Sequence, residues 1–266
     1  MGAPVEAGHV TITGSAEGTS RTSETPSLSA DDLSWLAGSL VILQGFDLRL
    51  SPGTVTGLIG PNGAGKSTAI DLLSGFRPPA SGSVSLLGKD VTHLPADQRT
   101  RLGLTRTFQE SPTIPGFSVR EHVQLAIEAS GRRPRKKPQA KELLDYVGLQ
   151  SVAEASAATL PIGKRRMLDV ARALGTAPSV LLLDEPFAGL EREDEDNLTR
   201  IIHDLKKDGT AVLIVEHRLA LLGEVVETVH VLVEGRPLAK GPLEEVLRDD
   251  RVQRAYLKAS GPGQPT

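Results

Sequence analysis

Residues 54–68 read Thr-Val-Thr-Gly-Leu-Ile-Gly-Pro-Asn-Gly-Ala-Gly-Lys-Ser-Thr. The first six are apolar and β-prone, which predicts a buried parallel strand. In the last nine, the glycines let backbone N–H groups turn inward around an anion without a Cβ in the way. A helix is expected to follow and to end near Gly75, because Ile70, Leu73 and Ser74 would share one side of it. Strand, glycine-rich loop and helix in this order predict a site for nucleotide phosphates.

The loop also carries the side chains that phosphate binding needs. Lys66 supplies a mobile positive charge for the outer phosphates, and Ser67 offers a hydroxyl to a magnesium ion. The helix that follows points the positive end of its dipole at the anion. The alternative, a glycine-rich turn without a ligand, is disfavoured by the strand and helix on either side. The predicted nucleotide contacts are Gly60, Pro61, Asn62, Gly63, Ala64, Gly65, Lys66, Ser67 and Thr68.

Bulk composition restricts the class of protein. The chain has 266 residues, 39% of them hydrophobic, enough for one large α/β domain or two modest ones. A net charge of −3 gives no basic excess, so no nucleic-acid partner is expected. The absence of cysteine excludes disulfides, thiolate metal sites and cysteine nucleophiles. Because we find neither an apolar run of ~20 residues nor a signal-peptide pattern, we expect a cytoplasmic protein that reaches a membrane only through a partner.

The remaining periodicities predict one α/β domain, in which a mixed sheet is flanked by helices. Residues 1–30, rich in Gly, Ser, Thr, Ala and Glu, are expected to form a disordered tail. The domain is expected at residues 31–260, before a flexible tail at 261–266. It should begin with an antiparallel β subdomain and contain an inserted helical subdomain at about residues 110–175. A basic run at residues 132–137 is interpreted as a solvated loop rather than a phosphate or lipid contact.

Polar residues follow two of the predicted buried strands. Asp184 and Glu185 come directly after the apolar run 180–183, and His217 closely follows the apolar run 211–215. The carboxyl ends of parallel strands meet at one edge of a sheet, where ligands bind. We expect Asp184 near magnesium and Glu185 at an attacking water as the catalytic base. His217 is expected at the γ-phosphate or at the water-activating carboxylate.

Gln109 lies where the sheet domain meets the helical insert. Its amide oxygen is expected to reach magnesium or water. Each of these residues has an ordinary alternative, since an acidic pair can begin a helix, a strand-end histidine can be incidental, and a lone glutamine can lie on the surface. The phosphate loop upstream favours the functional interpretation.

In this order the motifs resemble the nucleotide-binding subunit of an ATP-binding cassette (ABC) transporter, from about Leu33 to Lys258. The resemblance implies the P-loop NTPase fold, ATP and Mg²⁺ as cofactors, and ATP hydrolysis coupled to transport. The family's motifs correspond to the phosphate loop at 60–68, the Q-loop at Gln109, the signature near 160–164, Walker B at 180–185, the D-loop at 188–191 and the H-loop at His217.

Within the family the chain is most similar to the branched-chain amino-acid (LIV-type) importer ATPases, on segments 57–59, 104–109, 184–190 and 252–257. Urea importers and lipopolysaccharide-export ATPases share much of this pattern. The resemblance implies a head-to-tail dimer with two ATP molecules, each held between one subunit's phosphate loop and the other's signature. A heterodimer with a second ATPase subunit is preferred over a homodimer. Integral membrane permease subunits would dock around residues 109–119, which places the chain on the inner face of the cell membrane.

The signature departs from the family's Leu-Ser-Gly-Gly-Gln and reads Leu160-Pro161-Ile162-Gly163-Lys164. Pro161 removes a hydroxyl and a backbone N–H from the turn that faces the phosphate. Ile162 adds bulk, whereas Gly163 remains as a nucleotide contact. Lys164 is expected to replace part of the lost donors with its charge. We hypothesise that the composite site completed by this signature is weakened.

Two smaller departures concern adenine and the D-loop. The family stacks adenine on an aromatic residue whose matching position here is Ala37. Trp35 is expected to substitute for it, the alternative being a core or rim tryptophan. The D-loop acid is Glu191, one methylene longer than the usual aspartate.

Three functions stay open on the sequence. They are an importer ATPase for branched-chain amino acids or a similar solute, a non-transport cassette that regulates or binds, and a catalytically weakened ATP-binding partner. The solute itself is set by the membrane and periplasmic partners.

Overall fold

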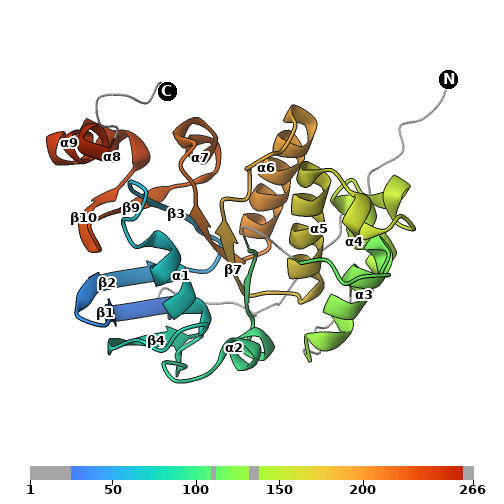
Figure 1. Cartoon of the computed structure of the whole chain (residues 1–266), viewed down its shortest axis with the longest axis horizontal. Coiled ribbons are helices and arrows are strands. Elements are labelled where there is room, and N and C mark those ends of the chain that lie inside the picture. Colours follow the sequence, from blue (N-terminus) through green and yellow to red (C-terminus); the bar gives the residue numbers. More distant parts are fainter. Residues whose placement is uncertain (1–24, 109–111, 132–137, 260–266) are drawn as a thin grey trace.

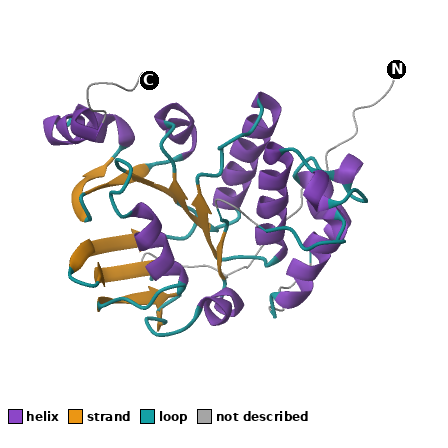
Figure 2. Ribbon diagram, viewed as in Figure 1, coloured by secondary structure: helices purple, strands orange, loops and turns teal. Residues whose placement is uncertain are grey.

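The computed structural model describes residues 25–108, 112–131 and 138–259. Figure 2 shows two β-sheets with helices around them. The larger sheet consists, in spatial order, of β10 (Arg236–Gly241), β9 (Thr228–Val233), β3 (Val55–Ile59), β8 (Ala211–Val215), β7 (Val180–Asp184) and β6 (Leu104–Arg106). All neighbouring strands in it are parallel except β10, which is antiparallel to β9. The mixed sheet expected from the sequence is confirmed.

The central strands of this sheet are apolar because both of their faces are covered. Every residue of β3, β7 and β8 is buried. Side chains alternate between the two faces of a strand. Leu181 and Leu183 join one hydrophobic core, whereas Val180 and Leu182 join a second. Each strand thus stabilises two separate cores, which fixes its register.

The smaller sheet is antiparallel and forms the expected N-terminal β subdomain. Its strands, in spatial order, are β2 (Leu40–Leu50), β1 (Leu28–Ala37), β4 (Ser81–Leu86) and β5 (Lys89–Asp90). In β2 the buried residues Phe46, Leu48 and Leu50 alternate with exposed Asp47 and Arg49. One face of β2 therefore packs on a core while the other meets solvent.

The predicted disordered tail over residues 1–30 is wrong at its end. β1 begins at Leu28, and Leu28, Ser29 and Ala30 are all buried. Leu28 pairs with Leu50 on one side and Leu86 on the other. Local composition hides this strand, because its burial comes from two partner strands far away in the chain.

Nine α-helices lie in the described ranges: α1 (Lys66–Ser74), α2 (Ala96–Leu102), α3 (Val119–Ala129), α4 (Ala140–Tyr146), α5 (Ile162–Gly175), α6 (Arg192–Lys207), α7 (Leu219–Val225), α8 (Leu243–Arg248) and α9 (Asp250–Ala259). In Figure 1, α3, α4 and α5 gather at the end of the molecule opposite the smaller sheet. They are the helical subdomain expected at about 110–175. None of the helices described is long and apolar enough to cross a membrane.

Local signals in the sequence begin and end several of these helices. The Ser118 side chain accepts a hydrogen bond from the Glu121 N–H, and the Glu121 carboxylate accepts one from the Ser118 N–H, so a capping box starts α3. Gly75 ends α1 in the left-handed conformation, as expected. The basic run at 132–137 and Gln109 lie outside the described residues.

Candidate functional site

The loop between β3 and α1 is shaped by backbone that other residues would obstruct. Gly60 has a φ of 151°, and a Cβ there would lie 2.1 Å from the Leu232 carbonyl oxygen. Gly65 has a φ of 98°, and its Cβ would lie 2.8 Å from the carbonyl oxygen of Ile42. Only glycine fits at these two positions, since both the conformation and the space exclude a side chain.

An anion site opens at the start of α1. The helix begins at Lys66, and no side chain caps its N-terminus, so the first N–H groups stay available to a ligand. The Lys66 Nζ donates hydrogen bonds to the carbonyl oxygens of Gly60 and Pro61, at 2.7 and 2.9 Å. Burial lowers the pKa of Lys66, while Glu185 and Asp184 oppose that shift. A positive charge is thus held across the loop, facing the two acids.

The sheet brings the acidic pair to the edge where the loop begins. β3, β8 and β7 run parallel side by side, and Asp184 pairs in register with Val215. The Glu185 N–H donates to the Val215 carbonyl oxygen at 2.9 Å, and Glu185 has a φ of 47°. Such left-handed conformations cost about 1–3 kcal/mol in a non-glycine residue and cluster at functional sites. The partly exposed Glu185 thus occupies this conformation directly after the end of β7.

His217 lies just beyond the end of the neighbouring strand β8. Its side chain is 58% exposed, and its Nδ1 lies 3.3 Å from the Glu216 Oε1 atom. Glu216 is 1% exposed, and the same Oε1 accepts hydrogen bonds from the backbone N–H groups of His217 and Arg218. The buried glutamate therefore fixes the turn that presents the imidazole at this edge.

Asp184 is held by neighbours from β6. Its Oδ2 accepts a hydrogen bond from the Arg106 Nη2 at 3.1 Å, and its N–H donates to the Thr107 Oγ1 at 3.3 Å. Burial raises the pKa of Asp184, and Arg106 opposes the shift. In the described part of the chain, no group of three or more His, Cys, Asp or Glu side chains could cage a metal. The oxygens of Asp184 and Ser67 suit Mg²⁺ instead, because this ion is usually held by one or two protein oxygens together with substrate phosphates.

Comparison with known proteins agrees with this geometry. A family model described as ABC transporter matches residues 43–188. The chain belongs to the ABC transporter family. This ABC ATPase is 34% identical over 249 residues to the high-affinity branched-chain amino acid transport ATP-binding protein LivG of Escherichia coli strain K12, covering 87% of this chain and 98% of that protein.

A second relative and a solved structure also belong to ATP-binding subunits of this kind. The lipopolysaccharide export system ATP-binding protein LptB of Acidithiobacillus ferridurans is 33% identical over 218 residues, covering 82% of this chain and 90% of that protein. A crystal structure of an ATP-binding cassette of an ABC transporter in its ADP conformation superposes with a TM-score of 0.78 at 27% identity, over 88% of this chain and 99% of that one. The chain is therefore the ATP-binding subunit of an ABC transporter and an ATPase.

Trp35 lies on β1 of this ABC ATPase with its ring beneath Arg77, whose guanidinium carbon is 4.8 Å from the ring centroid. Arg77 follows the C-terminal end of α1, whereas the phosphate loop precedes its N-terminal end. This contact favours the rim tryptophan over the adenine-stacking one, and Ala37 supplies no ring. The role predicted for Gln109 falls outside the described residues.

The signature lies at the N-terminus of α5, against the D-loop. A Cβ on Gly163 would lie 2.8 Å from the Gly189 carbonyl oxygen, so the two segments touch. Pro161 is the N-cap residue and makes no side-chain cap, while Ile162 is 65% exposed. Lys164 donates to Asp194 of α6 at 2.9 Å. The expectation that Lys164 replaces part of the lost phosphate donors stays a prediction, and in this structure its charge is paired with Asp194.

Two residues of the site escape inspection of the sequence. Glu216 directly follows the predicted strand 211–215, whereas no strand was predicted at β6, which ends at Arg106. Nothing local shows that either residue is buried against the acidic pair or the histidine. The strand end before Glu216 is the one signal that could have found it. D-loop residue Glu191, by contrast, is simply the N-cap residue of α6 and makes no side-chain cap.

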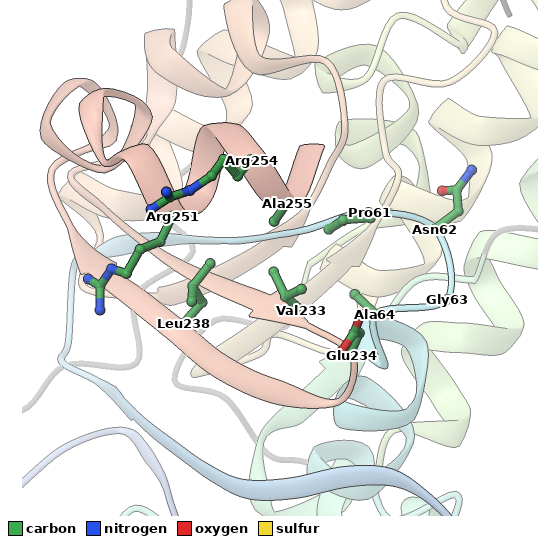
Figure 3. Close-up of a pocket in the computed structure, with 10 residues that line it drawn as sticks. All are labelled: Pro61, Asn62, Gly63, Ala64, Val233, Glu234, Leu238, Arg251, Arg254 and Ala255. Atoms are coloured by element: carbon green, nitrogen blue, oxygen red, sulfur yellow. The ribbon is translucent and has the colours of Figure 1, made fainter. Parts of the chain in front are cut away.

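A hollow of about 470 Å³ borders the loop on the side of β9, β10 and α9 (Figure 3). Pro61 and Ala64 line it together with Leu238 and Arg254. Neither acid of the strand edge lines it, and His217 does not either. The hollow therefore adjoins the back of the phosphate loop and does not contain the predicted catalytic groups.

Proposed function

We propose that this ABC ATPase energises uptake of branched-chain amino acids or a similar small solute. The observation that carries the proposal is the likeness to LivG, which covers 87% of this chain and 98% of that protein. The likeness to LptB keeps export of a lipopolysaccharide-type substrate as the second candidate. A urea importer is a third, supported only by the shared sequence pattern.

For catalysis, we propose that the loop of residues 60–68 binds ATP and that Ser67 and Asp184 hold Mg²⁺ with it. Gln109 would complete the metal's ligands. Mg²⁺, when bound, neutralises charge on the β- and γ-phosphates. Glu185 orients and deprotonates the attacking water, which its strained position beyond β7 supports. His217 contacts the γ-phosphate from the adjacent strand end.

Lys66 would leave its two carbonyl partners for the outer phosphates. The exchange replaces two neutral acceptors by a charged one, which makes a stronger hydrogen bond. Because the resting contacts hold Nζ inside the loop, little side-chain reordering is needed when ATP binds.

We propose a head-to-tail dimer in which each ATP contacts the phosphate loop of one subunit and the signature of the other, here Gly163 and its neighbours. Exposed Ile162 and uncapped Pro161 at the start of α5 support a weakened composite site. A heterodimer with a second ATPase subunit would retain one normal site, and this chain could then be the weaker partner. Permease subunits would dock near residues 109–119 and hold the chain at the inner face of the cell membrane. The charge of −3 supports a function without nucleic acid.

The test combines capture with transport. Membranes containing the tagged chain are solubilised, and co-purifying multi-span proteins are identified. Uptake of radiolabelled leucine is then compared between cells with the native chain and with Glu185→Gln, which retains the shape of the side chain but not the base. We expect a permease in the pull-down and leucine uptake reduced at least tenfold. A pull-down without any multi-span protein would contradict transport, and unchanged leucine uptake would favour another solute.

A further inference from the structure

Arg106, the last residue of β6, forms a buried bridge between two elements of the site. Its Nη1 donates to the Asp71 Oδ1 of α1 at 2.5 Å, and its Nη2 donates to the Asp184 Oδ2 at 3.1 Å. The Arg106 side chain is 9% exposed and the Asp184 side chain 5%. Charge-assisted hydrogen bonds of this kind are stronger than neutral ones, and the planar guanidinium fixes their directions.

Asp71 matters because of its place on α1. It lies four residues after Ser67, so the two side chains share one face of the helix, one turn apart. Arg106 therefore links the helix that carries Ser67 to the strand end that carries Asp184. The Thr107 hydroxyl, one residue further on, accepts the Asp184 N–H, so the end of β6 holds both the backbone and the carboxylate.

Two aromatic rings pack against the Arg106 guanidinium. The Arg106 guanidinium carbon lies 5.6 Å from the centroid of Phe76 and 5.1 Å from that of Phe108. The two rings also contact each other edge to face, with centroids 5.2 Å apart. Because it packs against both rings and is bound at both ends, Arg106 has little freedom to change rotamer.

We propose that Arg106 is a positioning residue that sets the separation between the Ser67 hydroxyl and the Asp184 carboxylate, and thereby the affinity for the divalent cation that accompanies ATP. The inference rests on the proposed roles of Ser67 and Asp184. Charge alone does not explain the arrangement, since a lysine would bring the same charge but no fork to span two carboxylates. The bridge would act on the metal only through Ser67 and Asp184, the two residues proposed to hold it.

Arg106→Lys tests the bridge with the charge retained. Binding of a non-hydrolysable ATP analogue to the full chain is measured in EDTA and across a MgCl₂ titration. Partners that orient metal ligands typically contribute 10–100-fold to metal affinity. We expect the Mg²⁺ concentration that gives half-maximal enhancement to rise at least tenfold, and binding in EDTA to change less than twofold.

Asp71→Asn tests the other end of the bridge without touching Asp184, and should reproduce the Mg²⁺ effect. The double variant should be no worse than either single one, because both break the same link. Arg77→Lys is the matched control: Arg77 also pairs with Asp71, at 2.8 Å, but does not reach Asp184, so the Mg²⁺ dependence should stay unchanged.

The outcomes are separable. If either variant lost the same affinity for the ATP analogue with and without Mg²⁺, the bridge would have only a structural role and the inference would be overturned. An unchanged Mg²⁺ titration would also overturn it. If the native chain itself showed no enhancement by Mg²⁺, the proposed metal site would fail and the inference with it. A thermal melt without ligand identifies a variant that does not fold, and Asp71→Asn then decides alone.

Discussion

Single residues carry much of the site, and their conformations explain why particular amino acids stand there. Glu185 occupies a backbone region that costs a non-glycine residue free energy, and it lies beyond β7 at the position proposed for the water-activating base. Gly60 and Gly65 are required by space as well as by φ. His230 is buried, and burial disfavours the protonated form of its imidazole.

Gly65→Ala should weaken nucleotide binding. The new Cβ would approach the Ile42 carbonyl oxygen to 2.8 Å in a conformation unfavourable for alanine, so the loop must move. We expect the affinity for a non-hydrolysable ATP analogue to fall at least tenfold, since strain of about 1–3 kcal/mol adds to the displaced N–H donors. Gly63→Ala is the control: its φ is 77° but no atom lies within 4 Å of the added Cβ. Equal losses in the two variants would exclude the clash as the cause.

His230 should make the fold sensitive to acid. Burial lowers the pKa of His230 to about 4, with Lys240 adding to the effect and Asp47 opposing it. Its Nε2 has no hydrogen-bond partner among the described residues. In the unfolded chain this histidine binds a proton near pH 6.5, and in the folded chain only near pH 4. The contribution of the neutral His230 to the free energy of unfolding is therefore fully present above pH 6.5 and is lost as the pH falls to 4.

His230→Phe keeps the edge-to-face contact with Phe46 but cannot be protonated. Between pH 7 and 4 the free energy of unfolding, measured with urea, should fall by up to about 3 kcal/mol less in this variant than in the native chain. Parallel pH profiles for the two proteins would show that His230 does not titrate in this window.

Among the elements, α1 depends on support at both of its ends. Its N-terminus is left uncapped for the ligand. Its C-terminus is capped by a residue of α2: Arg99 is fully buried and donates hydrogen bonds to the carbonyl oxygens of Leu72 and Leu73. Two further carbonyls, of Thr92 and Leu94, accept from the same guanidinium. The helix that presents Lys66 and Ser67 is thus anchored from its far end.

Arg99→Met should destabilise the protein by about 3–5 kcal/mol, because three buried carbonyl oxygens and a fourth that is partly buried lose their donors. Burial lowers the pKa of Arg99 to about 10, so the group stays charged at neutral pH. Arg101→Met on the same helix removes only an exposed ion pair with Asp97 and should cost less than about 1 kcal/mol. Urea unfolding of both variants measures the difference, and similar midpoints would contradict the role given to Arg99.

At the scale of the whole molecule, the proposed head-to-tail dimer would place this chain's signature against a partner's ATP. Pro161→Ser should restore a hydroxyl and a backbone N–H at the start of α5. Losing one such donor typically costs about 3–4 kcal/mol in the transition state, so we expect steady-state ATP turnover to rise at least tenfold. Pro161→Ala restores the N–H alone and should give a smaller gain. Turnover no faster in Pro161→Ser would show that this signature is not what limits hydrolysis.

Local pattern predicted much of the fold and of the candidate site. The apolar runs of β3, β7 and β8 were recognisable because both faces of these strands are buried, and the glycine spacing of residues 60–68 follows directly from the backbone geometry of an anion-binding loop. Asp184, Glu185 and His217 were found because the ends of parallel strands meet at one edge. The sequence did not predict the strand that begins at Leu28 or the packing of Arg77 on the ring of Trp35. It also did not predict the ion pair between Lys164 and Asp194.

The difference has a physical reason. Periodicity and turn chemistry act over a few neighbouring residues, so the chain alone specified the strands, the phosphate loop and the acids that follow β7. Long-range pairing acts between segments far apart, such as Asp71, Arg106 and Asp184, whose side chains meet only after three elements have packed together. Packing also decides which charges pair within the subunit, as Lys164 of α5 does with Asp194 of α6.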